Sequence, residues 1–270
     1  MESKSINICF IDTEFNALDY AIQNDGYQEI TEIGAVVFCN GKVIDRFSRY
    51  CKLKEGHKLT RRCKKITGIT AETLSQEGVT YLQAMKEFQN FLVKNKVKKI
   101  YAFGASDAFE MRSSAKLNNA DNTVYETIKK IKNVYPIFES RLELHYVFSL
   151  FDICRICYVN HDSDRAHNAV NDAEDTGLAY YNMKQNKINS ELLNEINVHK
   201  YNVKIYRAQR SVKMANIKRP DVVTAEFISS LEKVFENAGE VLGPPITRAV
   251  HDDMMRIIGR PDLELGEDDL

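Results

Sequence analysis

The chain has 270 residues, of which 44% are hydrophobic and 28% are charged. This composition supports a sizeable buried core and excludes a wholly disordered protein. The formal net charge of -1 provides no bulk attraction to nucleic acid, so any such binding needs local basic patches. No stretch approaches the roughly 20 apolar residues of a membrane span, and the polar residues 1–5 do not resemble a signal peptide. We therefore expect a cytoplasmic protein that does not act at a membrane.

The six cysteines lie mostly within apolar or strand-like runs, where a thiol behaves as a small hydrophobe. This usage suits a reducing compartment. Cys154 and Cys157 have the C-x-x-C spacing of metal and redox sites, but no second such pair and no nearby Cys-His set completes four ligands. The sequence therefore favours core thiols over a zinc site.

Residues 7–15 form an apolar run, rich in β-branched and aromatic residues, that predicts a buried strand. The run ends by placing Asp12 and Glu14 two positions apart, and side chains at i and i+2 share one face of a strand. Two like charges at a buried strand end repel each other and lose hydration. A divalent cation would compensate them, whereas an isolated Asp-x-Glu at a frayed strand end simply faces solvent.

An antiparallel meander is predicted to follow. Residues 16–28 are polar and include Asn24-Asp25-Gly26, which indicates a loop or turn. Residues 29–38 predict a second strand, Asn40-Gly41 a tight hairpin turn, and residues 42–50 a third strand.

Residues 51–73 are markedly basic. The basic residues are Lys52, Lys54, Lys58, Arg61, Arg62, Lys64 and Lys65. They precede residues 66–70, which predict an exposed apolar tip with a glycine. Basic residues beside such a tip suit contact with the backbone and bases of a nucleic acid. The alternative is a solvated, charged helix face.

Two further helices and a strand are predicted in the middle of the chain. Thr80 is a candidate cap for a helix whose apolar face is expected in the core. That face comprises Leu82, Met85, Phe88, Phe91 and Leu92. Residues 99–104 predict a strand, and a helix is expected from Phe109 onward. Asp107 lies at this junction, where a lone acid would often be only a helix cap.

The second half of the first 190 residues is less regular. Residues 118–139 are polar and give no clear assignment, and the apolar residues 144–158 are expected to return to the core as a helix or as a strand plus a helix. Residues 161–183 predict a helix packed by small or apolar side chains. These are Ala169, Ala173, Leu178 and Met183. Asp172 lies on this helix and His167 lies at its start.

Together these residues resemble the DEDDh exonucleases of the DnaQ-like group, whose pattern is Asp-x-Glu on the first strand, Asp at a helix start, and His-x4-Asp on a later helix. The matching residues are Asp12, Glu14, Asp107, His167 and Asp172. Residues 29–35 and 59–70 also resemble this group, and Cys63 before Lys64-Lys65-Ile66-Thr67-Gly68 is most similar to its enhanced-RNAi and KinA-inhibitor-like branch. The resemblance covers about residues 5–185. It implies an α/β, ribonuclease-H-like fold, a mixed central sheet with helices on both faces, although residues 118–142 are longer and more polar than this group's compact helix.

The resemblance also implies a metal-dependent site. Two divalent cations, Mg2+ or Mn2+, would be held by Asp12, Glu14, Asp107 and Asp172, with Asp12 bridging both ions. Glu14 and Asp172 would hold the ion on the side of the attacking water, and Asp107 would hold the other. All-oxygen ligation favours these metals over zinc. His167 would be the general base, since an imidazole with an ordinary pKa of about 6.5 can accept a proton near neutral pH.

The expected activity is 3′-to-5′ exonucleolytic hydrolysis of single-stranded nucleic acid 3′ ends, with RNA or short oligonucleotides favoured. By resemblance, Glu14 also contacts the terminal 3′-hydroxyl. Thr13, Phe15, Gly68 and Ile69 are the expected substrate-binding residues. The alternatives are a proofreading-type DNA exonuclease and a nucleic-acid-binding adaptor on the same scaffold that recruits a partner through the C-terminal helices.

Three segments are expected along the chain. Residues 1–190 form the exonuclease domain, residues 191–220 a basic connecting segment with interleaved tyrosines, and residues 221–270 a helical C-terminal extension with an acidic end. Two short amphipathic helices cannot bury their apolar faces alone. We therefore expect them to dock on the domain or to pair with a protein partner or a second copy of the chain.

Overall fold

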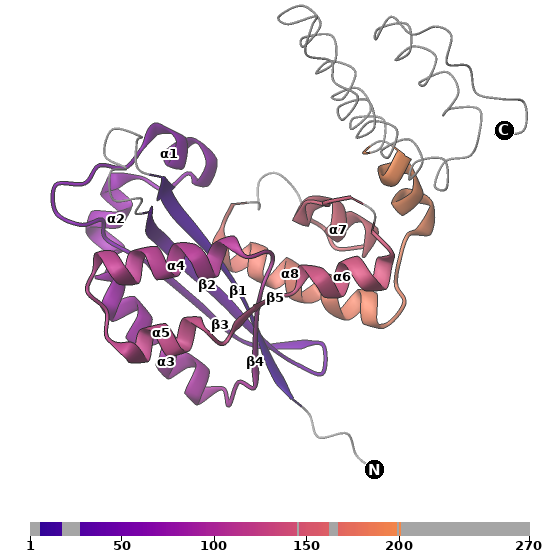
Figure 1. Ribbon diagram of the computed structural model, residues 1–270, viewed down its shortest axis with the longest axis horizontal. Helices are drawn as coiled ribbons and strands as arrows, with labels where there is room; N and C mark the ends of the chain where they lie inside the picture. The colour runs from indigo at the N-terminus through magenta and orange to yellow at the C-terminus, as the bar shows by residue number, and fades with distance from the viewer. Residues whose placement is uncertain (1–5, 18–27, 145, 162–166, 199, 201–270) are drawn as a thin grey trace, which may run out of the picture. The chain divides into compact units, whose positions relative to one another are not determined.

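The computed structural model describes residues 6–17, 28–144, 146–161, 167–198 and 200 (Figure 1). The chain divides into two compact units, Met1–Ser190 and Glu191–Leu270. In the second unit, residues 191–198 are helical. The predicted basic stretch beyond residue 200 and the predicted helices of residues 221–270 lie outside the described residues.

The predicted antiparallel meander is confirmed. Strands β1 (Asn7–Ala17), β2 (Gln28–Cys39) and β3 (Lys42–Tyr50) pair antiparallel in the order β3-β2-β1. Asn40 and Gly41 connect β2 to β3 with φ angles of 51° and 81°. Positive φ at both positions matches the twist of the two strands, which is why an Asn-Gly pair closes this hairpin.

Two parallel strands complete a mixed five-stranded sheet. β4 (Lys99–Ala102) pairs with β1, and β5 (Ile131–Asn133) pairs with β4, so the order is β3-β2-β1-β4-β5. β5 was not predicted from the sequence. It is an edge strand of three residues, of which Lys132 and Asn133 are exposed, so it carries no hydrophobic periodicity.

Helices cover both faces of this sheet, as expected (Figure 1). The helices are α1 (Arg61–Thr67), α2 (Ala71–Glu77), α3 (Tyr81–Lys94), α4 (Ser106–Leu117), α5 (Asn122–Ile128), α6 (Tyr135–Leu142), α7 (Leu150–Ile156) and α8 (Ala169–Lys184). The unassigned polar stretch therefore contains α5, β5 and most of α6, and the apolar run after it forms a helix. Within the described residues, no helix is both long and apolar enough to span a membrane.

The alternation of β1 side chains separates two cores. Cys9 and Ile11 pack into one core with side chains of α3, α4 and α5. Phe10 points the other way and packs against Tyr180 of α8, with ring centroids 5.4 Å apart. Since residues i and i+2 share a face, Asp12 and Glu14 follow Phe10 toward α8.

Helix α3 begins as predicted, because the Thr80 hydroxyl accepts a hydrogen bond from the Gln83 N–H at 3.3 Å. Met85, Phe88 and Phe91 of its apolar face are buried. The expectation was wrong for Leu82, whose side chain is 40% exposed. The buried residues of α3 are Tyr81, Ala84, Met85, Phe88 and Phe91, so Leu82 lies at the edge of the packed face and not on it.

Helix α8 lies unusually close to the sheet because glycines stand at the contact points. A Cβ built on Gly34 of β2 would lie 2.1 Å from the carbonyl carbon of Ala169. A Cβ on Gly177 would lie 2.3 Å from the ring of Phe38. Ala169 and Ala173 are buried, as predicted. The start of α8 is thereby seated directly on the strand beside β1.

Candidate active site

The site begins with Asp12 and Glu14 at the end of β1. β4 pairs with β1 only as far as Ile11, which pairs with Ala102. The last part of β1 therefore extends past its parallel neighbour. Glu14 is buried there, and both carboxylates lie on the strand face that α8 covers.

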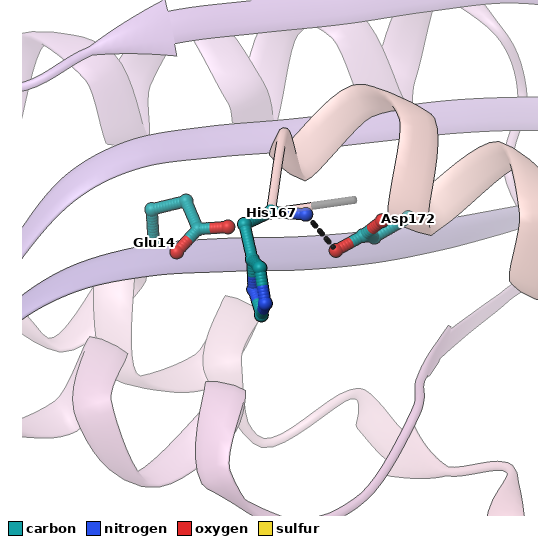
Figure 2. Close-up of side chains that lie close together, drawn as sticks. All are labelled: Glu14, His167 and Asp172. Atoms are coloured by element: carbon teal, nitrogen blue, oxygen red, sulfur yellow. Dashed lines mark hydrogen bonds between the residues drawn. The ribbon is translucent and has the colours of Figure 1, made fainter. Parts of the chain in front are cut away.

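The start of α8 brings His167 and Asp172 to this strand end. The His167 backbone N–H donates to Asp172 Oδ2 at 3.1 Å, and Asn168 caps the helix by accepting from the Asn171 N–H. Figure 2 shows the His167 side chain close to those of Glu14 and Asp172. One potential ligand atom from each of these three residues lies within 4.8 Å of the others. Residues far apart in the sequence thus form one cluster.

Asp107 reaches the same region from the first turn of α4. It is buried and accepts hydrogen bonds from the Thr13 N–H at 2.9 Å and from the Thr13 hydroxyl at 3.0 Å. Because β4 ends at Ala102, the Asp107 carboxylate takes the place of a strand partner for Thr13. The N-cap of α4 is Ala105, so a simple capping role does not account for Asp107.

Burial, together with mutual repulsion, raises the pKa values of the carboxylates in this cluster. Burial is the main cause for Asp12, whose pKa is well above its ordinary value, and Asp107, Asp172 and Glu14 add their repulsion. Burial, with repulsion from Asp172 and other acids, raises the pKa of Glu14 to about 8. Burial likewise raises the pKa of Asp107 to about 6. Four acids in such surroundings call for positive charge between them.

The donor set fits divalent cations. Asp172 Oδ1 is buried and accepts no hydrogen bond from any described residue, its neighbour His161 Nδ1 lying 3.9 Å away, so this oxygen can serve as a ligand. The candidate ligands are carboxylate oxygens beside one imidazole, which suit hard cations such as Mg2+ and Mn2+ better than soft ones. Of the four residues expected to hold metal, Glu14 and Asp172 lie in the cluster with His167, and Asp107 is hydrogen-bonded to Thr13, which stands between Asp12 and Glu14 on β1.

A fifth carboxylate, Glu32, belongs to this region and was not predicted. It lies on β2 directly opposite Glu14 and is 1% exposed. It accepts hydrogen bonds from the Ser48 hydroxyl at 3.0 Å and from the Ala169 N–H at 3.5 Å. Its pKa is raised, mainly by burial. The available signal was an acid in the middle of a strand that is buried on both faces.

Two other buried groups near the ligands were also missed. Glu110 lies one turn after Asp107 on α4, and burial, with repulsion from Asp107, raises its pKa to about 7. His161 Nδ1 lies 2.8 Å from Asp175 Oδ2, and both residues are buried. Asp175 follows Asp172 by one turn of α8. Acids three positions after each candidate ligand on a helix were the signal in both cases.

The four residues expected to bind substrate lie close to β1 or on the α1–α2 junction. Phe15 is half-buried against the core. Gly68 ends α1 with φ 71° and is exposed. Ile69 is buried, so of the two isoleucines in the expected apolar tip only Ile66 is exposed. Thr13 is buried and bonded to Asp107, which adds a positioning role to its expected substrate contact.

The fold and this acidic cluster define the class of ribonuclease-H-like nucleases. The exonuclease family RNase_T matches residues 9–180. The chain therefore belongs to this exonuclease family, which is a family of enzymes of the DnaQ-like superfamily.

Curated relatives agree with this assignment over part of their length. The chain is 28% identical over 197 residues to a DNA polymerase III PolC-type of Halalkalibacterium halodurans, covering 69% of this chain and 12% of that protein. It is 30% identical over 115 residues to the probable 3′-5′ exonuclease KapD of Bacillus subtilis, covering 42% of this chain and 55% of that one. The chain thus spans only part of the length of these relatives.

Solved structures share the fold at low sequence identity. The nuclease domain of 3′hExo, a DEDDh family member bound to rAMP, is 18% identical with a TM-score of 0.58, covering 70% of this chain and 98% of that one. The cell-death related nuclease CRN-4 is 18% identical with a TM-score of 0.55, covering 67% and 65%. The expected ribonuclease-H-like fold is confirmed.

Proposed function

We propose that this chain is a 3′-to-5′ exonuclease that hydrolyses the terminal phosphodiester bond of single-stranded nucleic acid, with RNA or short oligonucleotides favoured. The observation that carries the proposal is the cluster of Glu14, His167 and Asp172 within 4.8 Å. Asp107 joins this region through its hydrogen bonds to Thr13, which stands between Asp12 and Glu14 on β1. An imidazole beside several buried carboxylates is the arrangement expected for metal-assisted hydrolysis.

Asp12, Glu14, Asp107 and Asp172 would hold two divalent cations, Mg2+ or Mn2+. Bound there, the cations supply positive charge to the scissile phosphate and to the departing oxygen. Thr13 fixes one ligand in advance, because its N–H and hydroxyl both bond to Asp107. The His167 backbone N–H holds Asp172 in place in the same way, by donating a hydrogen bond to its carboxylate.

His167 would act as the general base. Its imidazole is exposed, while its main chain is tied to Asp172, so the ring can meet a water molecule at the surface of the cluster. The water oxygen forms a bond to phosphorus as the imidazole takes its proton. The bond from phosphorus to the 3′-oxygen of the preceding nucleotide breaks, that oxygen gains a proton, and a nucleoside 5′-monophosphate leaves.

Selection of the 3′ end would fall to residues around the end of β1. Glu14 would accept from the terminal 3′-hydroxyl, with Phe15 and Ile69 beside the last bases. The exposed Gly68 leaves open space next to its backbone, since a Cβ there would meet nothing within 4 Å. The bound rAMP of the 3′hExo nuclease domain supports RNA as substrate. Similarity to KapD supports placement in the enhanced-RNAi and KinA-inhibitor-like branch.

A proofreading-type DNA exonuclease is the second candidate. It is favoured by the PolC-type relative, which matches 69% of this chain. The match covers only 12% of that polymerase, so the polymerase functions do not transfer with it. Single-stranded DNA is therefore a necessary substrate in any assay.

The deciding assay uses the full chain with single-stranded RNA and DNA labelled at either end, in Mg2+, Mn2+ or chelator, beside Asp12→Asn. We expect stepwise, metal-dependent shortening from the 3′ end and loss of turnover in the variant. RNA cleavage faster than DNA cleavage supports the first candidate, and the reverse supports the second. The absence of metal-dependent cleavage of either polymer would refute both.

A further inference from the structure

A pocket of about 430 Å3 lies outside the acidic cluster, between the loop of residues 51–60, here called the basic loop, and helix α2. Its polar lining from the basic loop consists of Lys52, His57 and Lys58. No acidic residue is among the described residues that line it. Its volume falls within the usual range of about 300–1,000 Å3 for small-molecule sites. The pocket therefore has the size and charge for an anionic group.

The rest of the lining is largely apolar. Leu53 and Leu59 come from the basic loop, and Leu74 comes from α2. Ala71 and Ser75 complete the α2 wall. Two lysines beside an aliphatic surface suit a ligand that carries both a phosphate and an apolar ring face, which is the chemistry of a nucleotide.

The basic loop is held in place by two buried polar side chains. Glu29 is 3% exposed, and it accepts from the Lys54 N–H and pairs with His57 Nδ1, both at 2.8 Å. Asn16 is fully buried, donates to the Lys58 carbonyl at 3.1 Å and accepts from the Thr60 N–H at 2.9 Å. These hydrogen bonds fix the basic loop, so this side of the pocket has a defined shape.

The same side chains connect the pocket to the proposed active site. Asn16 and Glu29 face each other on β1 and β2, just beyond the pair Glu14 and Glu32. The opposite wall, α2, begins immediately after Ile69 and Thr70. Both walls therefore continue into segments proposed to hold the 3′ end.

We propose that this pocket binds a nucleotide of the substrate strand upstream of the 3′ end, with Lys52 and Lys58 contacting its phosphate and the leucines contacting its ring. This inference rests on the proposed function and adds a second contact point for the strand. It makes strand length a determinant of affinity, because a dinucleotide held at the acidic cluster leaves the pocket unfilled.

The test compares hydrolysis of a dinucleotide and of a 10-mer single strand by the full chain. Lys52→Gln combined with Lys58→Gln removes the cations, and Ser75→Trp fills the pocket from α2. Lys54→Gln is the matched control, because Lys54 belongs to the same loop and does not line the pocket. Unchanged dinucleotide hydrolysis in each variant shows that its fold and catalytic site are intact.

We expect the double variant to raise KM for the 10-mer about tenfold without changing dinucleotide kinetics, and Ser75→Trp to act in the same direction. The slope of log affinity against log salt should weaken by about 0.7 when the contact to one phosphate of a single strand is lost. Lys54→Gln should match the wild type. Wild-type length dependence and salt slope in both pocket variants would overturn the proposal.

Two further measurements test the pocket independently of catalysis and distinguish a strand-binding site from a free-nucleotide site. Binding of a fluorescein-labelled 10-mer to Asp12→Asn, with and without the pocket substitutions, tests the pocket even if the wild type hydrolyses nothing. Inhibition of dinucleotide hydrolysis by adenosine 5′-monophosphate tests for a free nucleotide. Equal inhibition of the wild type and the double variant supports a strand site, whereas weaker inhibition of the double variant would overturn it in favour of a free-nucleotide site.

Discussion

At the scale of single residues, His167 has two separate tasks in the proposed site. Its backbone N–H holds Asp172, and its imidazole lies between Glu14 and Asp172 (Figure 2). A substitution of the side chain leaves the backbone hydrogen bond in place. The two tasks can therefore be separated experimentally.

We predict that His167→Ala lowers kcat by roughly 10²–10⁴-fold, the usual contribution of a general base, while KM changes little. Steady-state kinetics on a labelled oligonucleotide measures both values. Divalent-cation affinity should stay close to that of the wild type if the carboxylates are the main ligands. Retention of wild-type turnover by His167→Ala would show that His167 is not the general base.

Thr13 offers a second test at this scale. Thr13→Val keeps the shape and the backbone N–H but removes the hydroxyl that donates to Asp107 at 3.0 Å. Loss of a hydrogen bond to a charged group is worth about 1.5–3 kcal/mol, so we expect weaker cation binding and slower turnover by about tenfold or more. Isothermal titration with Mn2+ reports the first effect. Thr123→Val, on the exposed start of α5, is the control, and equal behaviour of the two variants would refute the role of Thr13.

At the scale of elements, the close packing of α8 on β2 sets the position of Asp172. Gly34 meets the backbone of Ala169, and Glu32 accepts from the Ala169 N–H. Neither contact involves a candidate ligand directly. Both fix the helix turn that carries one.

Gly34→Ala should therefore weaken metal binding even though Gly34 is not a candidate ligand. The added Cβ would meet backbone atoms at 2.1–2.5 Å, so α8 must shift, at a cost of about 1–3 kcal/mol for such overpacking. We expect a lower free energy of unfolding, measured in denaturant, together with weaker Mn2+ binding. Ile44→Ala, at an exposed position of β3, should change neither. Normal stability and metal affinity in Gly34→Ala would show that metal binding does not require the close packing of α8 on β2.

The elements that could be predicted from the sequence are those with strong local signals. The meander of β1, β2 and β3 followed from β-branched runs and the Asn40-Gly41 turn, and α3 followed from Thr80 and its spacing. β5 could not be predicted, because three residues at a sheet edge show no periodicity. The five candidate site residues were expected from the resemblance to the DEDDh pattern, whereas the hydrogen bond between Thr13 and Asp107, 94 positions apart, depends on the packing of α4.

The same limit explains why Glu32 was missed. Its run was assigned to a strand, and its role depends on the Ala169 N–H, which approaches only when α8 packs on the sheet. His161 and Asp175 likewise form their pair through tertiary packing. Local sequence marks the ligands of such a site more clearly than the groups that support them.

At the scale of the whole molecule, the acidic cluster links stability to pH and to metal. A carboxyl whose pKa is raised in the folded state binds more protons there than in the unfolded chain. Its contribution to stability is therefore lost as pH rises. For Glu14 the window runs from the unfolded value of about 4.3 to the folded value of about 8.

We predict that the metal-free chain becomes less stable as pH rises from about 5 to 8. A divalent cation at 100 times its Kd should restore about 2.7 kcal/mol, which raises Tm by roughly 5–10 °C for a domain of this size. Thermal unfolding in chelator and in Mg2+ or Mn2+ measures both effects. Asp12→Asn should flatten the pH dependence and abolish most of the metal effect. Rising stability across this window without metal would contradict the raised pKa values.

The central claim is that acids from β1, α4 and α8 form one site for paired divalent cations. A crystal structure of the full chain soaked in Mn2+, with anomalous scattering to locate the ions, tests this claim most directly. The account predicts two peaks about 4 Å apart, each about 2.1 Å from its carboxylate oxygens, with Asp12 touching both. Well-ordered Asp12, Glu14, Asp107 and Asp172 without a manganese peak between them would contradict it.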